Sequence, residues 1–296
     1  KGSKVLVPDL TFAATINSVI LSGAEPIIVD INNYSWTLSI ELTEAAIKKF
    51  KPDAIVAVHT LGHPAEMDEL KLICKKYEIL LIEDAAGALG AEYKGKAVGC
   101  IGDAGIFSFN GNKLLTTGSG GALVFNKKFL IDKANILGRQ AKKGLDYNYI
   151  DVGYNYRMSN LNALLGYAQI EYFNELINKK RKIADIYDNA FKNINQFGVM
   201  PRLEWANSSC WLYSLRMNDK KSALSLINYL KQRNIEGRLF WNSLTIQKPF
   251  ESFQSILDGT SQTLNDKIVS IPCSSSLSVN AQNTVIQSIL DWDSIR

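Results

Sequence analysis

Short apolar runs rich in β-branched residues alternate along the first part of this chain with segments of helical pattern. Four such runs do not alternate in polarity, which is typical of strands covered on both faces: Val5–Val7, Pro26–Val29, Ala54–Val58 and Ile79–Ile82. Between them, apolar spacing predicts helices over Thr43–Phe50 and Glu66–Tyr77, the second with acidic residues in its first turn, where the helix dipole favours them. This alternation predicts an α/β fold with a mostly parallel sheet.

The second half of the chain has a different pattern. Gly105–Phe109 and Ala122–Phe125 are two further predicted strands, joined by a segment that contains a lysine and a glycine-rich turn. A long helical stretch follows, from about 160 to 192, and short strands such as Trp211–Met217 then alternate with a helix near Ser222–Gln232. We therefore predict a large α/β domain over 1–195 and a smaller α+β domain over 196–296.

Composition excludes several classes of protein. The 296 residues are 46% hydrophobic, which is ample for a packed core, and the net charge of +4 is spread along the chain. Its densest basic run, Lys179–Lys182, is typical of a solvated helix face and does not indicate nucleic acid. No apolar stretch approaches the ~20 residues of a membrane helix.

Cysteine spacing and the start of the chain bear on its compartment. No two of the four cysteines are close enough for a zinc ribbon or a redox pair, so we expect a reducing, cytoplasmic location: Cys74, Cys100, Cys210 and Cys273. No signal peptide is visible, but the sequence opens at Lys1 and runs directly into a predicted strand, so this absence says little about the full gene product.

A carboxylate follows the strand Ile79–Ile82, in the run Glu83–Gly87. Ligands of open α/β sheets bind at the carboxyl ends of the strands, so Asp84 can face a cofactor. An aspartate at this position can equally cap the turn that follows. The residues alone leave these two interpretations open.

Lys113 lies between a predicted buried strand and the glycine-rich turn Gly118–Gly121. Most lysines are surface residues, but the small residues around this one can admit a ligand. Lysine forms a Schiff base with pyridoxal phosphate, and burial can lower its pKa into a nucleophilic range. The cofactor also needs an acid at its pyridine nitrogen, and Asp84 at the end of a neighbouring strand is a candidate.

Five segments together resemble the DegT/DnrJ/EryC1/StrS sugar aminotransferases, which are fold-type-I pyridoxal phosphate enzymes. They occur in family order, extend over nearly the whole chain and are specific only in combination: Val7–Thr15, Glu83–Ala86, Ser108–Gly118, Gly153–Ser159 and Ile271–Leu277. The Asn-Gly-Asn-Lys-x-x-Thr-Thr context of Lys113 most resembles the nucleotide-sugar C4 aminotransferases of bacillosamine and legionaminic acid synthesis.

The resemblance implies roles for four residues around the cofactor. Lys113 matches the lysine that holds pyridoxal phosphate as a Schiff base, and Asp84 matches the partner of the pyridine nitrogen. Ser108 matches a phosphate ligand. Phe12 matches the position whose aromatic ring stacks on the cofactor ring, although by itself it would be taken for an ordinary core residue.

Two further residues matter for assembly. Asn155 and Arg157 match a loop that reaches the phosphate region of the neighbouring subunit, which implies a homodimer with shared active sites. Arginine suits this place because its planar fork matches phosphate oxygens, but it could also pair with an acid of its own subunit.

The chain departs from the family pattern at two points. Gly87 stands where most relatives carry glutamine, histidine or glutamate near the cofactor's phenolic oxygen. A longer stretch also precedes the first strand in the relatives, and its backbone amides bind the phosphate at a helix N-terminus. We therefore expect the 296 residues to be an incomplete or truncated form that does not suffice for activity.

The predicted reaction moves an amino group from glutamate, through pyridoxamine phosphate, to a keto carbon of a nucleotide-linked 4-keto-6-deoxy sugar, with Lys113 also acting as general base and acid. One alternative is a pyridoxal phosphate-dependent sugar dehydratase of the same family, but those enzymes carry histidine in place of the lysine. A second is a non-catalytic truncated relative, which Gly87 and the missing segment favour. The nucleotide, the sugar and the keto carbon stay open.

Two other patterns are only weak evidence for a metal site or a dinucleotide-binding loop. His59 and His63 have a spacing that suits a metal on a helix, but Gly62 and Pro64 indicate a turn there, so we predict no metal site. The run Gly118–Gly121 precedes a strand instead of opening a helix, which is wrong for a dinucleotide-binding loop. We expect it to form a hairpin turn beside the cofactor.

Overall fold

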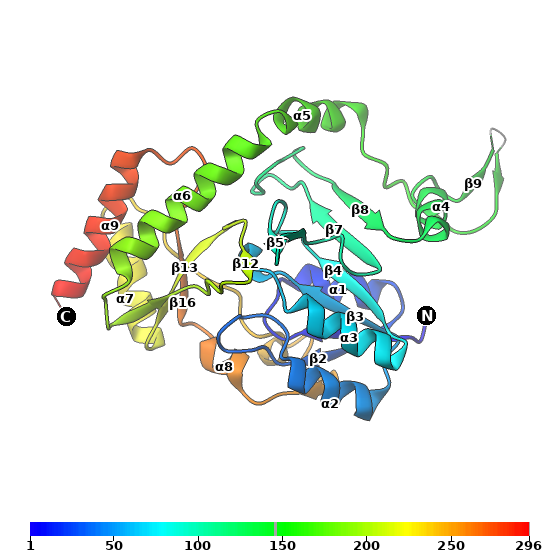
Figure 1. Ribbon diagram of the computed structural model, residues 1–296, viewed down its shortest axis with the longest axis horizontal. Helices are drawn as coiled ribbons and strands as arrows, with labels where there is room; N and C mark the ends of the chain where they lie inside the picture. Colours follow the sequence, from blue (N-terminus) through cyan, green and yellow to red (C-terminus); the bar gives the residue numbers. More distant parts are fainter. Residues whose placement is uncertain (145–146, 296) are drawn as a thin grey trace.

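A computed structural model describes residues 1–144 and 147–295, and its centre is a seven-stranded sheet (Figure 1). The strand order is β15-β2-β1-β3-β4-β7-β8, with every neighbouring pair parallel except the antiparallel β7 and β8. The bounds are Lys4–Pro8 (β1), Glu25–Val29 (β2), Ala54–Val58 (β3), Leu80–Asp84 (β4), Ala104–Ser108 (β7), Gly121–Phe125 (β8) and Ser255–Ile256 (β15). The predicted α/β class with a mostly parallel sheet is confirmed.

Helices cover both faces of this sheet, as the uninterrupted apolar strands require. The helices of this part are Ala13–Leu21 (α1), Ile40–Phe50 (α2), Met67–Tyr77 (α3) and Lys128–Leu137 (α4). Side chains of α2 and α3 share one core with β3, and Ile16 and Val19 of α1 share another with residues of β1 and β3. The hydroxyl of Ser39 caps α2 by accepting from the amide of Leu42, so this helix begins earlier than the apolar spacing predicts.

The predicted long helical stretch is two helices, Asn160–Ile170 (α5) and Phe173–Phe191 (α6). Tyr172 separates them with φ −94° and ψ 3°, which is outside the helical region. The long α6 then leads from the large sheet to the C-terminal part of the chain (Figure 1). The predicted solvated face over Lys179–Lys182 is wrong for Lys180, which is only 6% exposed.

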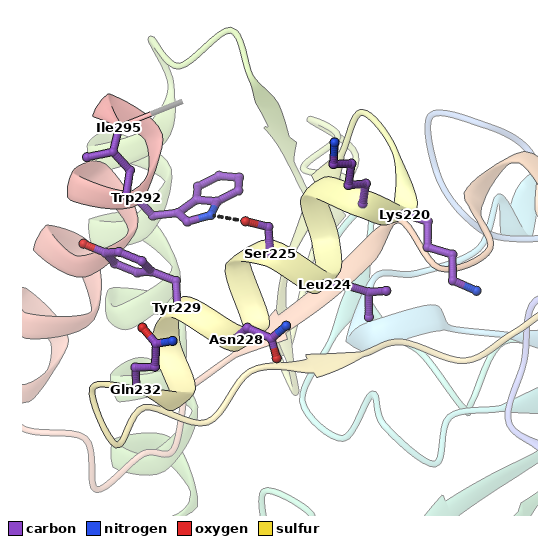
Figure 2. A pocket seen from close by; sticks show the side chains of 9 residues that line it. Lys220, Leu224, Ser225, Asn228, Tyr229, Gln232, Trp292 and Ile295 are labelled. Atoms are coloured by element: carbon purple, nitrogen blue, oxygen red, sulfur yellow. Dashed lines mark hydrogen bonds between the residues drawn. The ribbon is translucent and has the colours of Figure 1, made fainter.

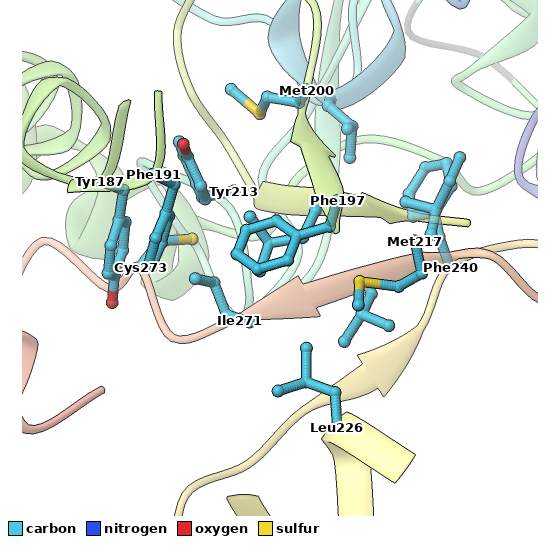
Figure 3. Packing of buried hydrophobic residues seen from close by; sticks show 14 of the residues in the cluster. Tyr187, Phe191, Phe197, Met200, Tyr213, Met217, Leu226, Phe240, Ile271 and Cys273 are labelled. Carbon is cyan, nitrogen blue, oxygen red and sulfur yellow. The ribbon is translucent and has the colours of Figure 1, made fainter. Parts of the chain in front are cut away.

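A second, antiparallel sheet lies in the C-terminal part, with the order β11-β13-β16-β14. Its strands are Phe197–Val199 (β11), Tyr213–Met217 (β13), Arg238–Leu239 (β14) and Ile268–Ile271 (β16). The helices Lys220–Lys231 (α7) and Val279–Ser294 (α9) belong to the same part, where Tyr187, Phe197, Tyr213, Met217 and Ile271 pack in one core (Figure 3). Strands and helices in this order confirm the predicted α+β character.

Part of the C-terminal region returns to the large sheet. Strand β15 pairs in parallel with β2, and Asp9 after β1 is fully buried. The Asp9 carboxylate accepts from the Thr245 amide at 2.8 Å and from the hydroxyls of Ser243 and Ser261. These bonds attach the chain between β14 and β16 to the carboxyl end of β1.

The remaining elements are short. They are Thr60–Gly62 (η1), Glu92–Tyr93 (β5), Lys96–Ala97 (β6), Lys142–Lys143 (β9), Asn148–Tyr149 (β10), Ala206–Asn207 (β12), Leu244–Ile246 (η2) and Thr260–Leu264 (α8). Across the described ranges, every helix is too short or too polar to cross a membrane.

Candidate active site

A cavity of about 880 Å³ lies at the carboxyl ends of the central strands, between the large sheet and the residues around β13 and β14. Of the six predicted site residues, four line it: Phe12, Asp84, Ser108 and Lys113. They come from separate parts of the chain, after β1, at the end of β4, at the end of β7 and in the connection from β7 to β8. Parallel pairing brings them together because it places the ends of β1, β4 and β7 at one edge.

Asp84, the last residue of β4, uses both carboxylate oxygens. Its Oδ2 accepts from the Thr15 hydroxyl at 2.7 Å, and its Oδ1 accepts from the Ala86 amide at 3.1 Å. The aspartate therefore caps the following turn and also faces the cavity, so the two interpretations of the sequence are compatible. Thr15 is buried and its hydroxyl lies 2.9 Å from that of Thr11, which fixes the carboxylate from the side of α1.

Lys113 lies half-buried in the connection between β7 and β8, where its amide donates to the Asn110 carbonyl at 3.0 Å. Its Nζ lies 3.4 Å from the centroid of a Trp211 ring. Burial lowers the pKa of Lys113 to about 8, against the opposing effect of the negative charge on Asp84. A large fraction of this amine is therefore neutral, and nucleophilic, at mildly alkaline pH.

Ser108 and Phe12 lie on other parts of the cavity wall. The Ser108 Oγ accepts from the Asn110 amide at 3.3 Å. Within the described part of the chain this hydroxyl donates to no acceptor, so it can donate to an anion. Phe12 precedes α1, is 56% exposed, and its ring centroid lies 5.6 Å from that of Trp241. It is therefore a wall residue and not an ordinary core phenylalanine.

Asn155 and Arg157 do not line the cavity of their own chain. Both lie exposed in the segment before α5, where Asn155 forms an isolated bridge with Arg139. No carboxylate among residues 1–144 and 147–295 forms an ion pair with Arg157. Their predicted role on a neighbouring subunit stays a prediction.

Trp211 accounts for the absence of a side chain at Gly87. A methyl group on Gly87 would lie 2.6 Å from Cε3 of the indole, so the two cannot coexist in this arrangement. Trp211 also lines the cavity, yet only its position in a predicted strand was available from the sequence. The sequence pattern carried no signal for this contact.

The residues of the cavity fit pyridoxal phosphate. They supply an amine of lowered pKa on Lys113, a carboxylate on Asp84 and an exposed aromatic face on Phe12. The hydroxyl of Ser108 adds a free donor for a phosphate. Both histidines are engaged with protein atoms, although His59 also lines the cavity: His59 Nε2 lies 3.1 Å from Glu83 Oε2, and His63 Nδ1 lies 2.9 Å from the Pro64 carbonyl.

A second cavity, also about 880 Å³, lies between α7 and α9 (Figure 2). Trp292 forms part of its wall and donates through Nε1 to the Ser225 hydroxyl at 3.1 Å. Lys220, at its rim, forms an ion pair with Asp266 at 2.8 Å. None of the predicted site residues lies there, so the first cavity is the candidate active site.

A mostly parallel seven-stranded sheet with this cavity at its carboxyl edge, next to an antiparallel C-terminal sheet, is the architecture of the fold-type-I aminotransferases. A DegT DnrJ EryC1 StrS aminotransferase from Brucella abortus superimposes with a TM-score of 0.92 at 26% identity, over 99% of this chain and 80% of that one.

Sequence comparison identifies the family. Residues 1–290 match the model of the DegT/DnrJ/EryC1/StrS aminotransferase family, and the chain belongs to it. EpsN of Bacillus subtilis (strain 168) is 36% identical over an alignment of 300 positions that covers 98% of this chain and 77% of EpsN. The GDP-perosamine synthase of Escherichia coli O157:H7 is 38% identical over 86% of this chain and 70% of its own length. A UDP-4-amino-4,6-dideoxy-N-acetyl-beta-L-altrosamine transaminase of Campylobacter jejuni (strain 81-176) is 39% identical over 73% of this chain and 58% of its own.

Proposed function

We propose that this protein transfers an amino group from glutamate to the keto carbon of a nucleotide-linked 4-keto-6-deoxy sugar, with pyridoxal phosphate held by Lys113. The observation that carries the proposal is that the Lys113 amine, with its pKa lowered to about 8, shares a cavity with the Asp84 carboxylate. Two relatives whose names specify GDP- and UDP-linked sugars support the substrate class. The glutamate donor rests on the family resemblance.

Each of these side chains has a separate role in the proposed reaction. Pyridoxal phosphate, when bound, supplies an electron sink for the substrate carbon that bears the nitrogen. Asp84, oriented by Thr15, would keep a proton on the pyridine nitrogen. Ser108 would donate to the phosphate, and Phe12, on the cavity wall, would cover the ring and exclude water. Lys113 would hold the cofactor through Nζ, and the same nitrogen, once the substrate amine has taken its place, would move a proton between carbon atoms.

We also propose that the active protein is a homodimer that shares its sites. Arg157 is exposed and has no acidic partner in the described ranges, so it is available to a phosphate of a second subunit. Large apolar side chains on the same segment and on α5 are about half or more exposed: Tyr154, Tyr156, Leu161, Leu164, Tyr167 and Ile170. An apolar surface of this kind marks an interaction site, and its continuity with Arg157 favours a second copy.

A direct assay tests the proposed function. Full-length protein loaded with pyridoxal phosphate is given glutamate together with UDP-, dTDP-, GDP- and CDP-linked 4-keto-6-deoxy sugars, and the amino sugar is measured by mass spectrometry. We expect turnover of at least one of them, and complete loss of turnover in Lys113→Ala. Failure with all four sugars, alongside fast amination of simple keto acids, would contradict the substrate class.

The same samples test the role of the lysine. Lys113→Ala should lose the visible absorbance of covalently attached cofactor, because it lacks the amine that forms the bond. The exposed Lys179→Ala serves as the control and should keep it. An unchanged absorbance band in Lys113→Ala would remove Lys113 from the mechanism.

A further inference from the structure

Trp211 makes three contacts with the part of the cavity that holds the lysine. The face of its indole lies under Lys113, with Nζ 3.4 Å from the ring centroid. Its Nε1 donates to the carbonyl of Asn112 at 2.9 Å, next to Lys113 in the chain. The indole therefore contacts both the ammonium group and the backbone that carries it.

The third contact concerns Gly87, at the turn after Asp84. A methyl group on Gly87 would lie 2.6, 3.2 and 3.3 Å from Cε3, Cδ2 and Cζ3 of the indole. The φ angle of Gly87 is not in the left-handed region, so the backbone conformation itself would accept a side chain. The glycine is required by space alone, and that space is occupied by the six-membered ring of Trp211.

The indole is itself held firmly. Trp211 is only 8% exposed, and its carbonyl accepts a hydrogen bond of 2.7 Å from the buried Nζ of Lys180 on α6. Its ring centroid lies 6.1 Å from that of Trp241. A ring that is buried, held at its backbone and packed near a second indole can define where a flexible lysine lies, because a lysine ammonium over an indole is attracted by the ring face.

We propose that Trp211 is the positioning residue of the cofactor lysine: its ring face lies against the Lys113 side-chain nitrogen, and its N–H holds the carbonyl of Asn112, the residue before Lys113, in the space that Gly87 leaves open. The inference rests on the proposed function only in that Lys113 is taken as the residue that binds pyridoxal phosphate. Gly87 and Trp211 then form a matched pair, in which a side chain at position 87 displaces the indole.

The contact can be tested without any cofactor. Replacing Lys113 by methionine keeps most of the unbranched side chain and removes its charged end, so it should change the tryptophan emission of the cofactor-free protein. The same substitution in a Trp211→Phe background should leave the emission of the four other tryptophans unchanged, since the chain has five. Equal emission changes in both backgrounds would overturn the inference, whatever the protein does with pyridoxal phosphate.

The positioning effect is measured by the rate at which cofactor-free protein captures added pyridoxal phosphate, in a condensation of the Lys113 amine with the aldehyde that releases one water. Trp211→Phe keeps an aromatic ring but loses the N–H that bonds the Asn112 carbonyl, so capture measured above pH of about 8, where the Lys113 amine is largely neutral, should slow about tenfold. The melting temperature should fall only slightly. A purely structural tryptophan would give the opposite result, a lower melting temperature with an unchanged capture rate.

Substitutions at Gly87 test the matched pair. Gly87→Ala should slow capture in the natural background but add nothing in a Trp211→Ala background, since the ring that it displaces is already gone. Gly198→Ala is the control, because its methyl group would meet nothing closer than Arg216 Cβ at 4.0 Å. Additive effects of Gly87→Ala and Trp211→Ala would show that the two positions are independent and would refute the pair.

Discussion

At the scale of single residues, the charge on Asp84 acts on the amine of Lys113. Burial lowers the pKa of Lys113 to about 8, and Asp84 opposes this by stabilising the charged form. Only the neutral amine captures pyridoxal phosphate, so the capture rate should rise with pH and level off above about 8. Asp84→Asn removes the opposing charge, so the midpoint of the profile should move to lower pH.

The measurement is the absorbance change of cofactor-free protein after mixing with pyridoxal phosphate, at pH values on both sides of 8. Asp68→Asn is a suitable control, because this exposed carboxylate pairs with Lys94 on the surface. A midpoint that stays in place or rises in Asp84→Asn would show that Asp84 does not act electrostatically on Lys113.

At the scale of secondary-structure elements, a buried lysine joins α6 to two neighbouring strands at one end of the antiparallel sheet. Lys180 Nζ donates to the carbonyl of Trp211, just before β13, and to that of Cys273, just after β16. Lys180→Met keeps the apolar stem but leaves both carbonyls without this donor. We expect a loss of about 2 kcal/mol in the free energy of unfolding, measured by urea denaturation.

The neighbouring Lys179 provides the matched control. Its ion pair with Glu175 lies on the surface of α6, and such pairs contribute little to stability. Lys179→Met should therefore change the free energy of unfolding by less than about 0.5 kcal/mol. Equal losses of unfolding free energy in the two variants would mean that the hydrogen bonds of Lys180 contribute no more to stability than a surface ion pair.

At the scale of the whole molecule, the question is whether each subunit completes its own site. If Arg157 reaches the partner, a hybrid of Lys113→Ala and Arg157→Ala subunits has both defects in one cavity and leaves the other intact. Equal mixing should then restore roughly a quarter of the normal activity, because half of the dimers are hybrids with one working site. Native mass spectrometry confirms hybrid formation, and hybrids without activity would show that each subunit builds its own site.

The sequence alone determined the class of the sheet and the edge at which the candidate site lies. Long apolar runs and turn residues are local signals, so β1, β2, β3 and β4 could be predicted near their observed bounds. Asp84 and Lys113 follow such strands, and parallel pairing dictates that strand ends meet. The family resemblance added Phe12 and Ser108, which the structure brings to the same cavity.

Only the tertiary structure decided what fills the space around those residues. Thr15 donates a hydrogen bond to Asp84, and Trp211 occupies the space beside Gly87. Lys180 is buried, although the basic run that contains it predicted a solvated helix face. The break between α5 and α6 was equally invisible, since neither glycine nor proline marks it. Periodicity reports which face of an element is buried, but the partner on that face depends on how distant elements pack, and this is not encoded in any local pattern.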